Sequence, residues 1–496
     1  MDIVHGLLTG IEPANLLFAF IGCATGILFG ALPGISSAMG VVLLLPFTYT
    51  MDGVSAIILL VANFAGSTYG GSITSILYAT PGTPEAVMTV LDGHPMHKKG
   101  LGGKALGLAV SASVLGGLFS AIMMVVLCVP LSKVALQFSP AEYVALAIIG
   151  LTAIAGLGGK SQLKTLISGL LGLTLATFGS DEITGITRFN FGSLSFVNGI
   201  HFIPVMIGAF ALSEVFMQAM EKMEERDLSI TKKIKVELMS LAEFIKYKWV
   251  ILKSAFLGMF IGTLPGAGGT IAAVLAYSEA VRSSKHGDQF GTGVPEGVIA
   301  PETANNASNG GALVPTLTLG IPGSGTTAVI LAAFVLHGMR PGPLLFISQP
   351  DLLYAVFVAL IIADLMLFWG GIYGVRLFAQ VSRFPYHLQG STILVLCFIG
   401  SYALQNDILN SWIMLLAGIV GFFMKRFGFS VAGLVLGLVL GELIELNIRK
   451  MMIITGGDWS GLFLRPIAGP IFLLAIGAVA FPHIKKWLER RKLQAA

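Results

Sequence analysis

The sequence predicts an all-α, polytopic membrane protein, and two observations lead to that prediction. Hydrophobic residues make up 55% of the 496-residue chain and charged residues only 11%, whereas a typical soluble domain carries about 25% charged residues. A soluble chain of this length with so few charges could not cover its own surface. The second observation is a succession of apolar runs of roughly 20 residues, the length at which a helix crosses the hydrocarbon of a bilayer.

We expect about 12–15 apolar segments of this kind. Several are short or interrupted by Pro-Gly, which predicts broken helices or re-entrant hairpins. In the first half of the chain the segments are 14–30, 31–49, 54–78, 105–129, 141–157, 163–178 and 200–218. In the second half they are 249–264, 266–281, 310–338, 352–378, 391–404, 409–424, 431–446 and 463–482.

The distribution of charge divides the chain into three parts. A charged stretch, 221–248, separates an N-terminal transmembrane repeat (1–220) from a C-terminal one (249–496), and we expect it to be an amphipathic connector on the membrane surface. The lysines of this connector, of loop 98–104 and of the C-terminal tail predict that all three are cytoplasmic. The N-terminus begins without lysine or arginine and is expected in the periplasm, so the first repeat crosses the membrane an odd number of times.

The two halves also resemble each other. The stretch "GALPGISSAMGVVLLLPF" at 30–47 resembles "GTLPGAGGTIAAVLAYSE" at 262–279, an offset of 232 residues. Farther along, two more pairs match in the same order after a one-residue gap, namely Gly70-Gly71 with Gly310-Gly311 and Pro81-Gly82 with Pro322-Gly323. Like halves that start on opposite sides predict the inverted-topology repeat of many secondary transporters. The alternative is that these are common helix-interrupting sequences with no shared origin.

The Pro-Gly breaks predict a ligand site. A helix broken at Pro-Gly exposes amide N–H groups at the N-terminus of the next piece, where the helix dipole also favours an anion. Hydroxyls after the break can cap that piece or donate to a carboxylate, and glycines leave room for close approach. The predicted substrate-binding residues are Gly70, Gly71, Pro81, Gly82, Thr83, Gly310, Gly311, Pro322, Gly323, Ser324, Thr326 and Thr327. The alternative is tight helix–helix packing through small residues.

Further polar residues precede each break. Asn305 and Asn309 are four residues apart and share a helical face, with Asn306 beside them, and Asn63 and Thr68 occupy comparable places in the first half. Their side-chain oxygens can coordinate Na⁺, and their amides can hold a carboxylate. These five residues are the predicted coupling-ion ligands. The alternative is a polar loop that caps the apolar helix after it.

The same motifs carry a family resemblance. The stretches "GALPGISSAMGVVLLLPFTY", "PGTPEAVMTVLDGHP" and, most specifically, residues 262–346 resemble the large membrane subunit (TctA type) of the tripartite tricarboxylate transporters. The resemblance covers essentially the whole chain and implies an ion-gradient-driven importer of citrate-like di- and tricarboxylates in a bacterial inner membrane. It also implies two partners, a small membrane subunit and a periplasmic solute-binding protein that delivers the substrate. No residue assignment is carried over, so the predicted site rests on the physics of broken helices.

Other function classes compete with this one. A stand-alone carboxylate carrier of related hairpin architecture would need no binding protein. An intramembrane enzyme would need a metal motif, paired aspartates or a serine–lysine or serine–histidine pair at depth, and we identify no such set in the sequence. The mid-span Asp364 favours an interior hydrogen bond or subunit contact over an ion-carrying role. Three separated cysteines in apolar segments indicate neither zinc nor a disulfide. We therefore expect no enzymatic activity, no bound metal or cofactor beyond co-transported Na⁺ or H⁺, and no nucleic-acid partner.

Overall fold

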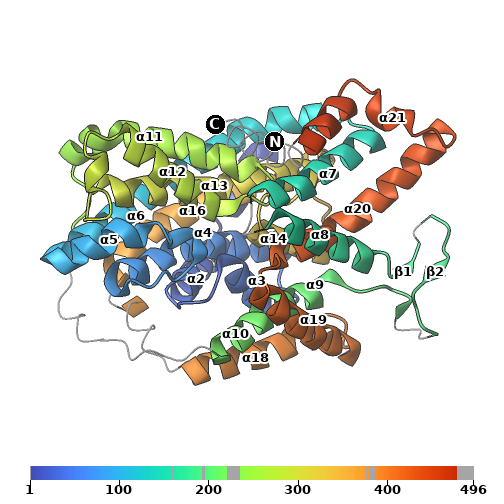
Figure 1. Cartoon of the computed structure of the whole chain (residues 1–496), viewed down its shortest axis with the longest axis horizontal. Helices are drawn as coiled ribbons and strands as arrows, with labels where there is room; N and C mark the ends of the chain where they lie inside the picture. Colours follow the sequence, from blue (N-terminus) through green and yellow to red (C-terminus); the bar gives the residue numbers. More distant parts are fainter. Residues whose placement is uncertain are drawn as a thin grey trace, which may run out of the picture.

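The computed structural model describes residues 2–157, 161–181, 183–192, 196–220, 235–375, 377–378 and 386–477. Within these ranges the chain is almost entirely helical (Figure 1). Strands β1 (Gly179–Ser180) and β2 (Thr187–Arg188) form a short antiparallel ladder that projects at one end of the molecule. The predicted all-α class is confirmed.

The helices of the first half follow one another with short connections. Two of them, η2 and η4, are π-helical turns within longer helical runs, and η1 is a single 3₁₀ turn. The elements are α1 (Asp2–Gly10), α2 (Pro13–Gly30), α3 (Ser37–Thr48), α4 (Gly53–Tyr78), η1 (Pro84–Ala86), α5 (Thr89–Met96), η2 (His97–Leu101), α6 (Gly102–Ala135), α7 (Pro140–Leu157), α8 (Gln162–Ala176), α9 (Phe202–Met206), η4 (Ile207–Leu212) and α10 (Ser213–Met220).

The second half begins with α11 and repeats the pattern of long helices separated by short breaks. A further apolar helix covers residues 468–477. The elements are α11 (Leu241–Thr263), α12 (Gly268–Ser283), η6 (Gly287–Gln289), α13 (Glu296–Leu319), α14 (Gly325–Leu336), α15 (Leu345–Ser348), α16 (Pro350–Tyr373), α18 (Tyr386–Ala403), α19 (Ile408–Arg426), α20 (Val431–Thr455) and α21 (Ser460–Phe463).

Short polar side chains set the starts of several of these helices. Ser36 accepts a hydrogen bond from the Met39 N–H at the start of α3, and Asp52 accepts one from the Val54 N–H at the start of α4. At α11, Ser240 begins a capping box in which its hydroxyl and a glutamate three residues later satisfy each other's backbone N–H groups. Such caps satisfy N–H groups that a helix cannot satisfy itself, so the sequence fixes these boundaries locally.

Among the described residues, seven helices are long and apolar enough to cross a membrane, and six shorter apolar helices accompany them. This confirms a polytopic membrane protein. The long candidates are Pro13–Gly30, Gly53–Tyr78, Thr89–Ala135, Phe202–Met220, Pro350–Tyr373, Ile408–Arg426 and Val431–Thr455.

One predicted segment differs from the structure. Residues 310–338 are divided between α13 and α14, and α13 begins at Glu296 instead of 310. The polar stretch 300–309 is therefore the interior of a helix, and all of it is buried. Polarity at these positions does not indicate solvent, because neighbouring helices provide hydrogen-bond partners for the side chains, as described below.

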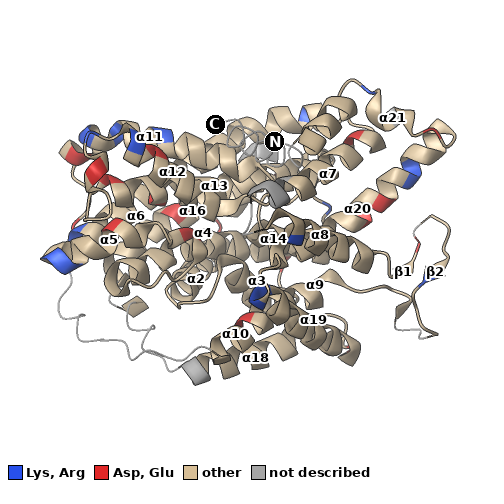
Figure 2. Ribbon diagram, in the orientation of Figure 1, with Lys and Arg blue, Asp and Glu red and all other residues tan. Residues whose placement is uncertain are grey.

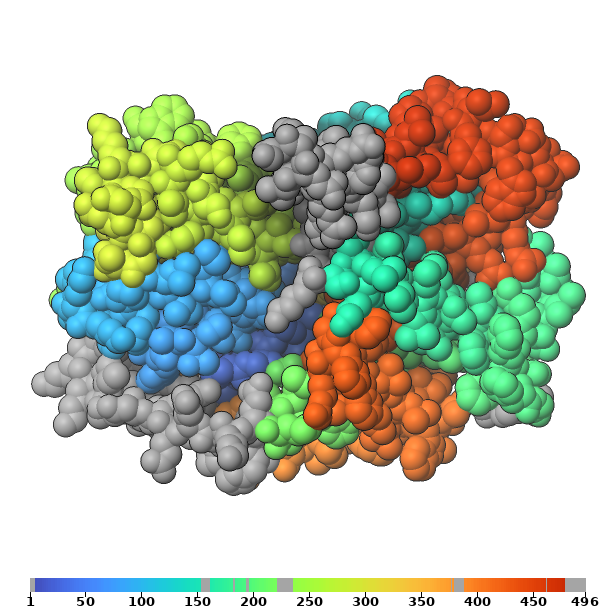
Figure 3. Space-filling model, in the orientation of Figure 1, coloured from blue at the N-terminus to red at the C-terminus, as the bar shows by residue number. Residues whose placement is uncertain are grey.

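Helices from both halves form one bundle. Helix α2 packs along α4, and α11 packs along α13, while α6 lies against α13 and α16 lies against α4 and α6. Figure 3 shows this bundle as the blue and yellow layers on the left, and α7, α8 and α20 as the teal and red group on the right. Helix α20 packs chiefly on α8 and α7. Most predicted site residues belong to the first group or to the turns at its helix ends, whereas Thr326 and Thr327 lie on α14 (Gly325–Leu336), which contacts α3, α4 and α13 as well as α20.

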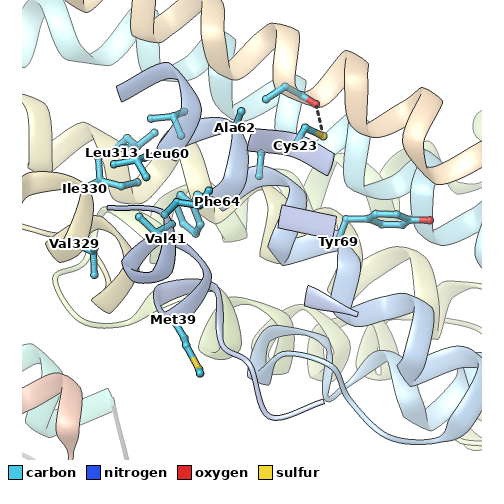
Figure 4. Close-up of a cluster of buried hydrophobic side chains, with 14 of the residues drawn as sticks. Cys23, Met39, Val41, Leu60, Ala62, Phe64, Tyr69, Leu313, Val329 and Ile330 are labelled. Carbon is cyan, nitrogen blue, oxygen red and sulfur yellow. Dashed lines mark hydrogen bonds between the residues drawn. The ribbon is translucent and has the colours of Figure 1, made fainter. Parts of the chain in front are cut away.

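The core of the bundle is shared between the halves. Leu60 of α4 lies beside Leu313 of α13 and Ile330 of α14 (Figure 4), and all three belong to one buried cluster. Because these residues are fully buried, the two halves remove one another's apolar surface from solvent. They do not form independent units.

Only part of the predicted connector 221–248 is described. Residues 221–234 lie outside the described residues, as does the C-terminal tail from 478; residues 235–240 are not helical, and α11 then begins at Leu241. Lys104 pairs with Glu243 at 2.6 Å, so the end of the connector lies beside loop 98–104. Figure 2 shows charged residues gathered around α5, α11 and α12 at one end of the view. The two lysine-bearing segments thus lie at the same end of the bundle.

Candidate functional site

Each half contains two interruptions, and the first follows Leu-Pro-Gly. Between α2 and α3 the chain turns at Gly34, which has φ 88°, and between α11 and α12 it turns at Gly266, which has φ 76°. A positive φ of this size is accessible to glycine at little cost. The two glycines are 232 residues apart, so the offset found in the sequence also relates two glycines of positive φ at the same place in their turns.

The second interruption follows α4 in one half and α13 in the other. Helix α4 ends at Ala79 with φ 54°, and α13 ends at Gly320 with φ 70°, a separation of 241 residues. We name residues 79–83 the first tip and residues 320–324 the second tip. Both consist of a left-handed residue, a non-helical Pro-Gly and then a new helical turn.

After each tip the chain returns against the interior of the helix that it has just left. The Gly82 N–H donates to the Gly71 carbonyl of α4 at 3.3 Å, and a Cβ atom at Gly323 would lie 2.6 Å from the Cα of Ala312 in α13. The Gly323 carbonyl also accepts from the Gly266 N–H, between α11 and α12, at 2.9 Å. A Cβ atom at Gly82 would lie 2.0 Å from the Gly30 carbonyl oxygen. The Pro-Gly glycines are therefore required by close backbone approach, so part of the motif is a packing device.

Glycine contacts in the structure change the pairing of Gly70-Gly71 with Gly310-Gly311 that the sequence suggests. A Cβ atom at Gly70 would lie 3.0 Å from the Cα of Gly30, and one at Gly311 would lie 3.0 Å from the Cα of Gly262. Gly70 therefore corresponds to Gly311 and not to Gly310, so one offset of 241 covers the helix, the tip and the Pro-Gly without a gap. Gly310 instead faces the Ser120 backbone of α6.

At the second tip, the predicted hydroxyls are used by the protein itself. Ser324 is the N-cap of α14; its hydroxyl accepts from the Thr327 N–H at 3.2 Å, and the Thr327 hydroxyl accepts from the Ser324 N–H at 2.9 Å. Thr326 and Pro322 are buried beside them. A reciprocal cap of this kind stabilises the helix start, and it leaves these hydroxyls less available to a ligand.

At the first tip, the corresponding hydroxyl is free of such a role. Thr83 is 1% exposed, caps no helix, and has no hydrogen-bond partner among the described residues. The residue that corresponds to Thr327 is Ala86, which has no hydroxyl with which to complete a reciprocal cap. Pro81 and Gly82 lead the chain into this position in a non-helical conformation.

The predicted coupling-ion residues are all buried, and two hydrogen bonds from this set cross between the halves. The Thr68 hydroxyl donates to the Asn309 side-chain oxygen at 3.2 Å, and these two positions are themselves 241 residues apart. Asn305 donates to the Glu85 backbone carbonyl at 3.2 Å and accepts from Asn306 at 2.8 Å. The Thr68–Asn309 bond thus joins α4 of the first half to α13 of the second half.

Several atoms of this set have no partner among the described residues. They are the side-chain oxygens of Asn63 and Asn306 and the side-chain nitrogen of Asn309. Asn63 of α4 donates to the Thr25 hydroxyl of α2 at 3.2 Å, so its side chain lies apart from the others, against α2. An unpartnered buried polar atom is costly, which favours a ligand, ion or water at these places.

The structure adds a buried carboxyl that we did not assign to the site from the sequence. Glu302 is fully buried on α13, and three hydroxyls from three other helices donate to it: Ser72 at 2.6 Å, Ser113 at 3.0 Å, and Thr89. Three neutral donors around one carboxyl can stabilise a negative charge without a cation. The spacing of these four residues in the sequence contains no signal that could have brought them together.

Two further buried acidic side chains differ in how many hydrogen bonds they accept. Asp92 of α5 accepts from the N–H groups of Gly291, Gly293 and Val294 and from the Tyr277 hydroxyl, all at 2.8–2.9 Å. Asp364 is buried on α16 with neither oxygen hydrogen-bonded to any described residue. The interior hydrogen bond that the sequence favours for it is therefore not present in the described chain.

The stretches that contain the two tips offer neutral hydrogen-bond donors, helix N-termini and the carboxyls of Glu85 and Glu302. The stretches 60–90 and 300–339 contain no lysine or arginine. Among the described residues no three His, Cys, Asp or Glu side chains are grouped as a metal site would require. Such an arrangement suits the binding of an anion together with a small cation.

Comparisons with known proteins agree with the resemblance seen in the sequence. Residues 16–436 match the model of the family described as the tripartite tricarboxylate transporter TctA family. The chain is 36% identical over 495 residues to an uncharacterized 52.8 kDa protein of the TAR-I ttuC' 3' region of Agrobacterium vitis, covering 99% of this chain and 98% of that protein. It is also 36% identical over 222 residues to a protein of the TAR-II ttuC' 3' region of the same organism, covering 45% of this chain and 91% of that protein.

Proposed function

Since the chain belongs to the tripartite tricarboxylate transporter TctA family, we propose that it is the subunit through which a citrate-like di- or tricarboxylate crosses a bacterial inner membrane. An ion gradient drives the uptake, with Na⁺ or H⁺ as the co-transported ion. A periplasmic binding protein delivers the substrate, and a small membrane subunit completes the complex. The family is one of transporters, so the chain carries out transport and not catalysis.

The observation that supports this proposal most is the pair of tips. Each returns against the interior of a buried helix, which is where discontinuous helices place substrate in secondary transporters. The N-terminal ends of α12 and α14 lie together, since the Gly266 N–H reaches the Gly323 carbonyl and a Cβ atom at Gly268 would lie 3.7 Å from Ser324. Positive helix ends favour an anion, each by roughly 0.3–2 kcal/mol, so several must act together.

We further propose that the halves are inverted-topology repeats, with the N-terminus in the periplasm and the C-terminus in the cytoplasm. The offset of 241 and the Thr68–Asn309 bond support the repeat. The position of the lysines supports the orientation. A reporter that is active only in the cytoplasm, fused at residue 235, should give a signal; activity from a periplasm-only reporter at that site would contradict the orientation.

Uptake in membrane vesicles tests the transport proposal. Vesicles that contain this chain and the small subunit should accumulate labelled citrate or another di- or tricarboxylate when the periplasmic protein is added and a Na⁺ or pH gradient is imposed. Omission of the periplasmic protein or of both gradients should abolish accumulation. Full-rate uptake by this chain alone would favour the stand-alone carrier instead.

A further inference from the structure

A cluster of three oxygen atoms beneath the first tip has no role in the contacts described above. It consists of Glu85 Oε2, Thr83 Oγ1 and Ser37 Oγ, each buried and each without a hydrogen-bond partner among the described residues. Thr83 is 1% exposed and Ser37 is 0% exposed. Both hydroxyls face the Glu85 carboxyl as potential hydrogen-bond donors, although neither meets the distance and angle of a formed hydrogen bond.

Two glycines keep the space around this cluster open. A Cβ atom at Gly71 would lie 2.4 Å from the Thr83 hydroxyl, and one at Gly269 would lie 2.8 Å from Glu85 Cγ and 3.1 Å from the Ser308 hydroxyl. Side chains at either position would fill the space in front of the three oxygens. The cluster is thus a cradle formed by η1, the start of α3, the start of α12 and the middle of α4.

The charge of the cluster is not balanced by a basic side chain. Glu85 takes part in none of the salt bridges of the described residues. The starts of α3 and α12 lie close by and compensate part of a negative charge through their dipoles. A di- or tricarboxylate bound at the tips would add further negative charge beside Glu85, which favours a positive ion between them.

We propose that Glu85, Thr83 and Ser37 bind a monovalent cation, and that Na⁺ is the ion that fits these ligands best. This cation bridges the Glu85 carboxylate to a carboxylate of the substrate. Carboxylate and hydroxyl oxygens are hard ligands suited to such ions. One carboxylate matches a single positive charge, whereas a divalent ion is usually held by more acidic ligands. The bridging role rests on the proposed function, but the cation site does not.

The bridge explains how uptake could be coupled to the ion. Without the cation, Glu85 and the substrate carboxylate repel each other; with it, each ligand increases the affinity for the other, and the coupling is reciprocal. The predicted coupling-ion residues at Asn305 and Asn309 lie on the neighbouring α13. Asn305 supports the cradle through its hydrogen bond to the Glu85 carbonyl.

The test uses the purified full-length chain in detergent and measures thermal unfolding against NaCl concentration, with ionic strength held constant by choline chloride. We expect a saturable rise in melting temperature with Na⁺ that is not reproduced by Mg²⁺ or Ca²⁺ at equal ionic strength. Glu85→Gln should raise the half-saturating Na⁺ concentration at least tenfold. Glu12→Gln makes the same chemical change at an exposed carboxyl and should leave the Na⁺ response unchanged.

Gly269→Ala provides a second variant that keeps all three oxygens and fills the cradle, and it should weaken Na⁺ binding in the same assay. Binding of radioactive ²²Na⁺ to the wild-type chain gives a direct measurement if either variant fails to fold. Absence of Na⁺ binding by the wild type, or an unchanged Na⁺ response in both variants, would overturn the site. Stabilisation by acid instead of Na⁺, abolished by Glu85→Gln, would show that Glu85 carries a proton and would likewise overturn it.

Adding citrate to the Na⁺ titration then distinguishes the proposed cation site from the proposed bridge to the substrate. If the bridge is correct, citrate should lower the half-saturating Na⁺ concentration of the wild-type chain and should not do so for Glu85→Gln. Na⁺ binding that responds to Glu85→Gln but not to any carboxylate would leave the cation site standing and contradict the bridge. Failure of the vesicle uptake assay alone would count against the transport proposal and not against the cation site.

Discussion

At the second tip, Ser324 and Thr327 hydrogen-bond each other's backbone across the start of α14, whereas at the first tip the corresponding Thr83 has no partner and Ala86 takes the place of Thr327. The backbones match: both tips have a left-handed residue, a Pro-Gly and a return to the preceding helix. The side chains do not. A repeated backbone motif can therefore serve as a closed structural cap in one half and leave an open polar site in the other, so the two copies need separate tests.

The largest loss of stability is expected when a side chain is placed where the backbone of each tip packs closely against another backbone segment. A Cβ atom at Gly82 would lie 2.0 Å from the Gly30 carbonyl, and one at Gly323 would lie 2.6 Å from the Ala312 Cα. Gly82→Ala and Gly323→Ala should each destabilise the chain by about 1–3 kcal/mol or more, as overpacking does, and should abolish uptake. Thermal unfolding of the purified variants checks this.

Gly477→Ala is the matched control, because no atom of the described residues lies within 4 Å of a Cβ atom there, and its melting temperature should be unchanged. If only one of the two tip variants loses stability, the backbone equivalence of the tips is contradicted.

A somewhat smaller loss is expected at the bond that joins equivalent positions of the two halves. Thr68→Val removes the hydroxyl whose single proton is shared between the Asn309 side-chain oxygen at 3.2 Å and the Phe64 carbonyl at 3.0 Å, and leaves the Asn309 oxygen buried without this partner. The expected cost is about 1–3 kcal/mol, measured as a fall in the free energy of unfolding. Thr174→Val, at an exposed position, should cost much less. Equal losses for the two variants would show that the Thr68–Asn309 bond contributes nothing specific.

Removing the Ser324 hydroxyl and removing the Thr83 hydroxyl should have opposite effects on the stability of the chain. Ser324→Ala removes an N-cap and should lower stability by about 1 kcal/mol. Thr83→Val removes a buried hydroxyl without a partner, so stability without ligand should be unchanged or higher. Substrate uptake should then need a higher cation concentration in Thr83→Val. Equal destabilisation by the two changes, in chemical denaturation without ligand, would remove the distinction between the tips.

The smallest effect is expected from Ala79→Gly, at the left-handed residue that begins the first tip, and Gly320→Ala is its counterpart at the second tip. Ala79 has φ 54° and Gly320 has φ 70°, and alanine in this region is strained by roughly 1–2 kcal/mol. Gly320→Ala should therefore lower stability by about that amount, while Ala79→Gly should raise it by less, because glycine loses more entropy on folding. Unfolding measurements on both variants test the pair, and a destabilising Ala79→Gly would mean that its methyl group packs productively.

The sequence predicted the breaks well, because Pro-Gly acts locally. Proline removes an N–H and fixes φ, and glycine permits the close approach, so Pro81-Gly82 and Pro322-Gly323 were identified without knowledge of the fold. The reciprocal cap of Ser324 and Thr327 is likewise a local pattern. Whether the hydroxyl after each Pro-Gly caps a helix or is left for a ligand was not predictable. It depends on the residue three positions later, which at the first tip is Ala86, a residue without a hydroxyl.

The buried acids were beyond prediction for a different reason. Glu302 is stabilised by Ser72, Thr89 and Ser113, which lie on three other helices 189–230 residues away. Local polarity usually means exposure, so the apolar segment expected from the sequence begins only at 310, after this polar stretch and its predicted ion ligands. Its hydrogen-bond partners exist only once the helices have assembled, and a single sequence does not reveal which distant hydroxyls will meet.

The Asp92 contacts have a consequence for how the chain is made. This acid leaves the ribosome 199–202 residues before the backbone N–H groups that it accepts from. Until the loop before α13 has been synthesised, the first half carries a carboxylate that cannot be buried at the place it occupies in the finished protein. A nascent first half is thus expected to keep α5 near water and to remain a client of the insertion machinery until the second half is available to complete it.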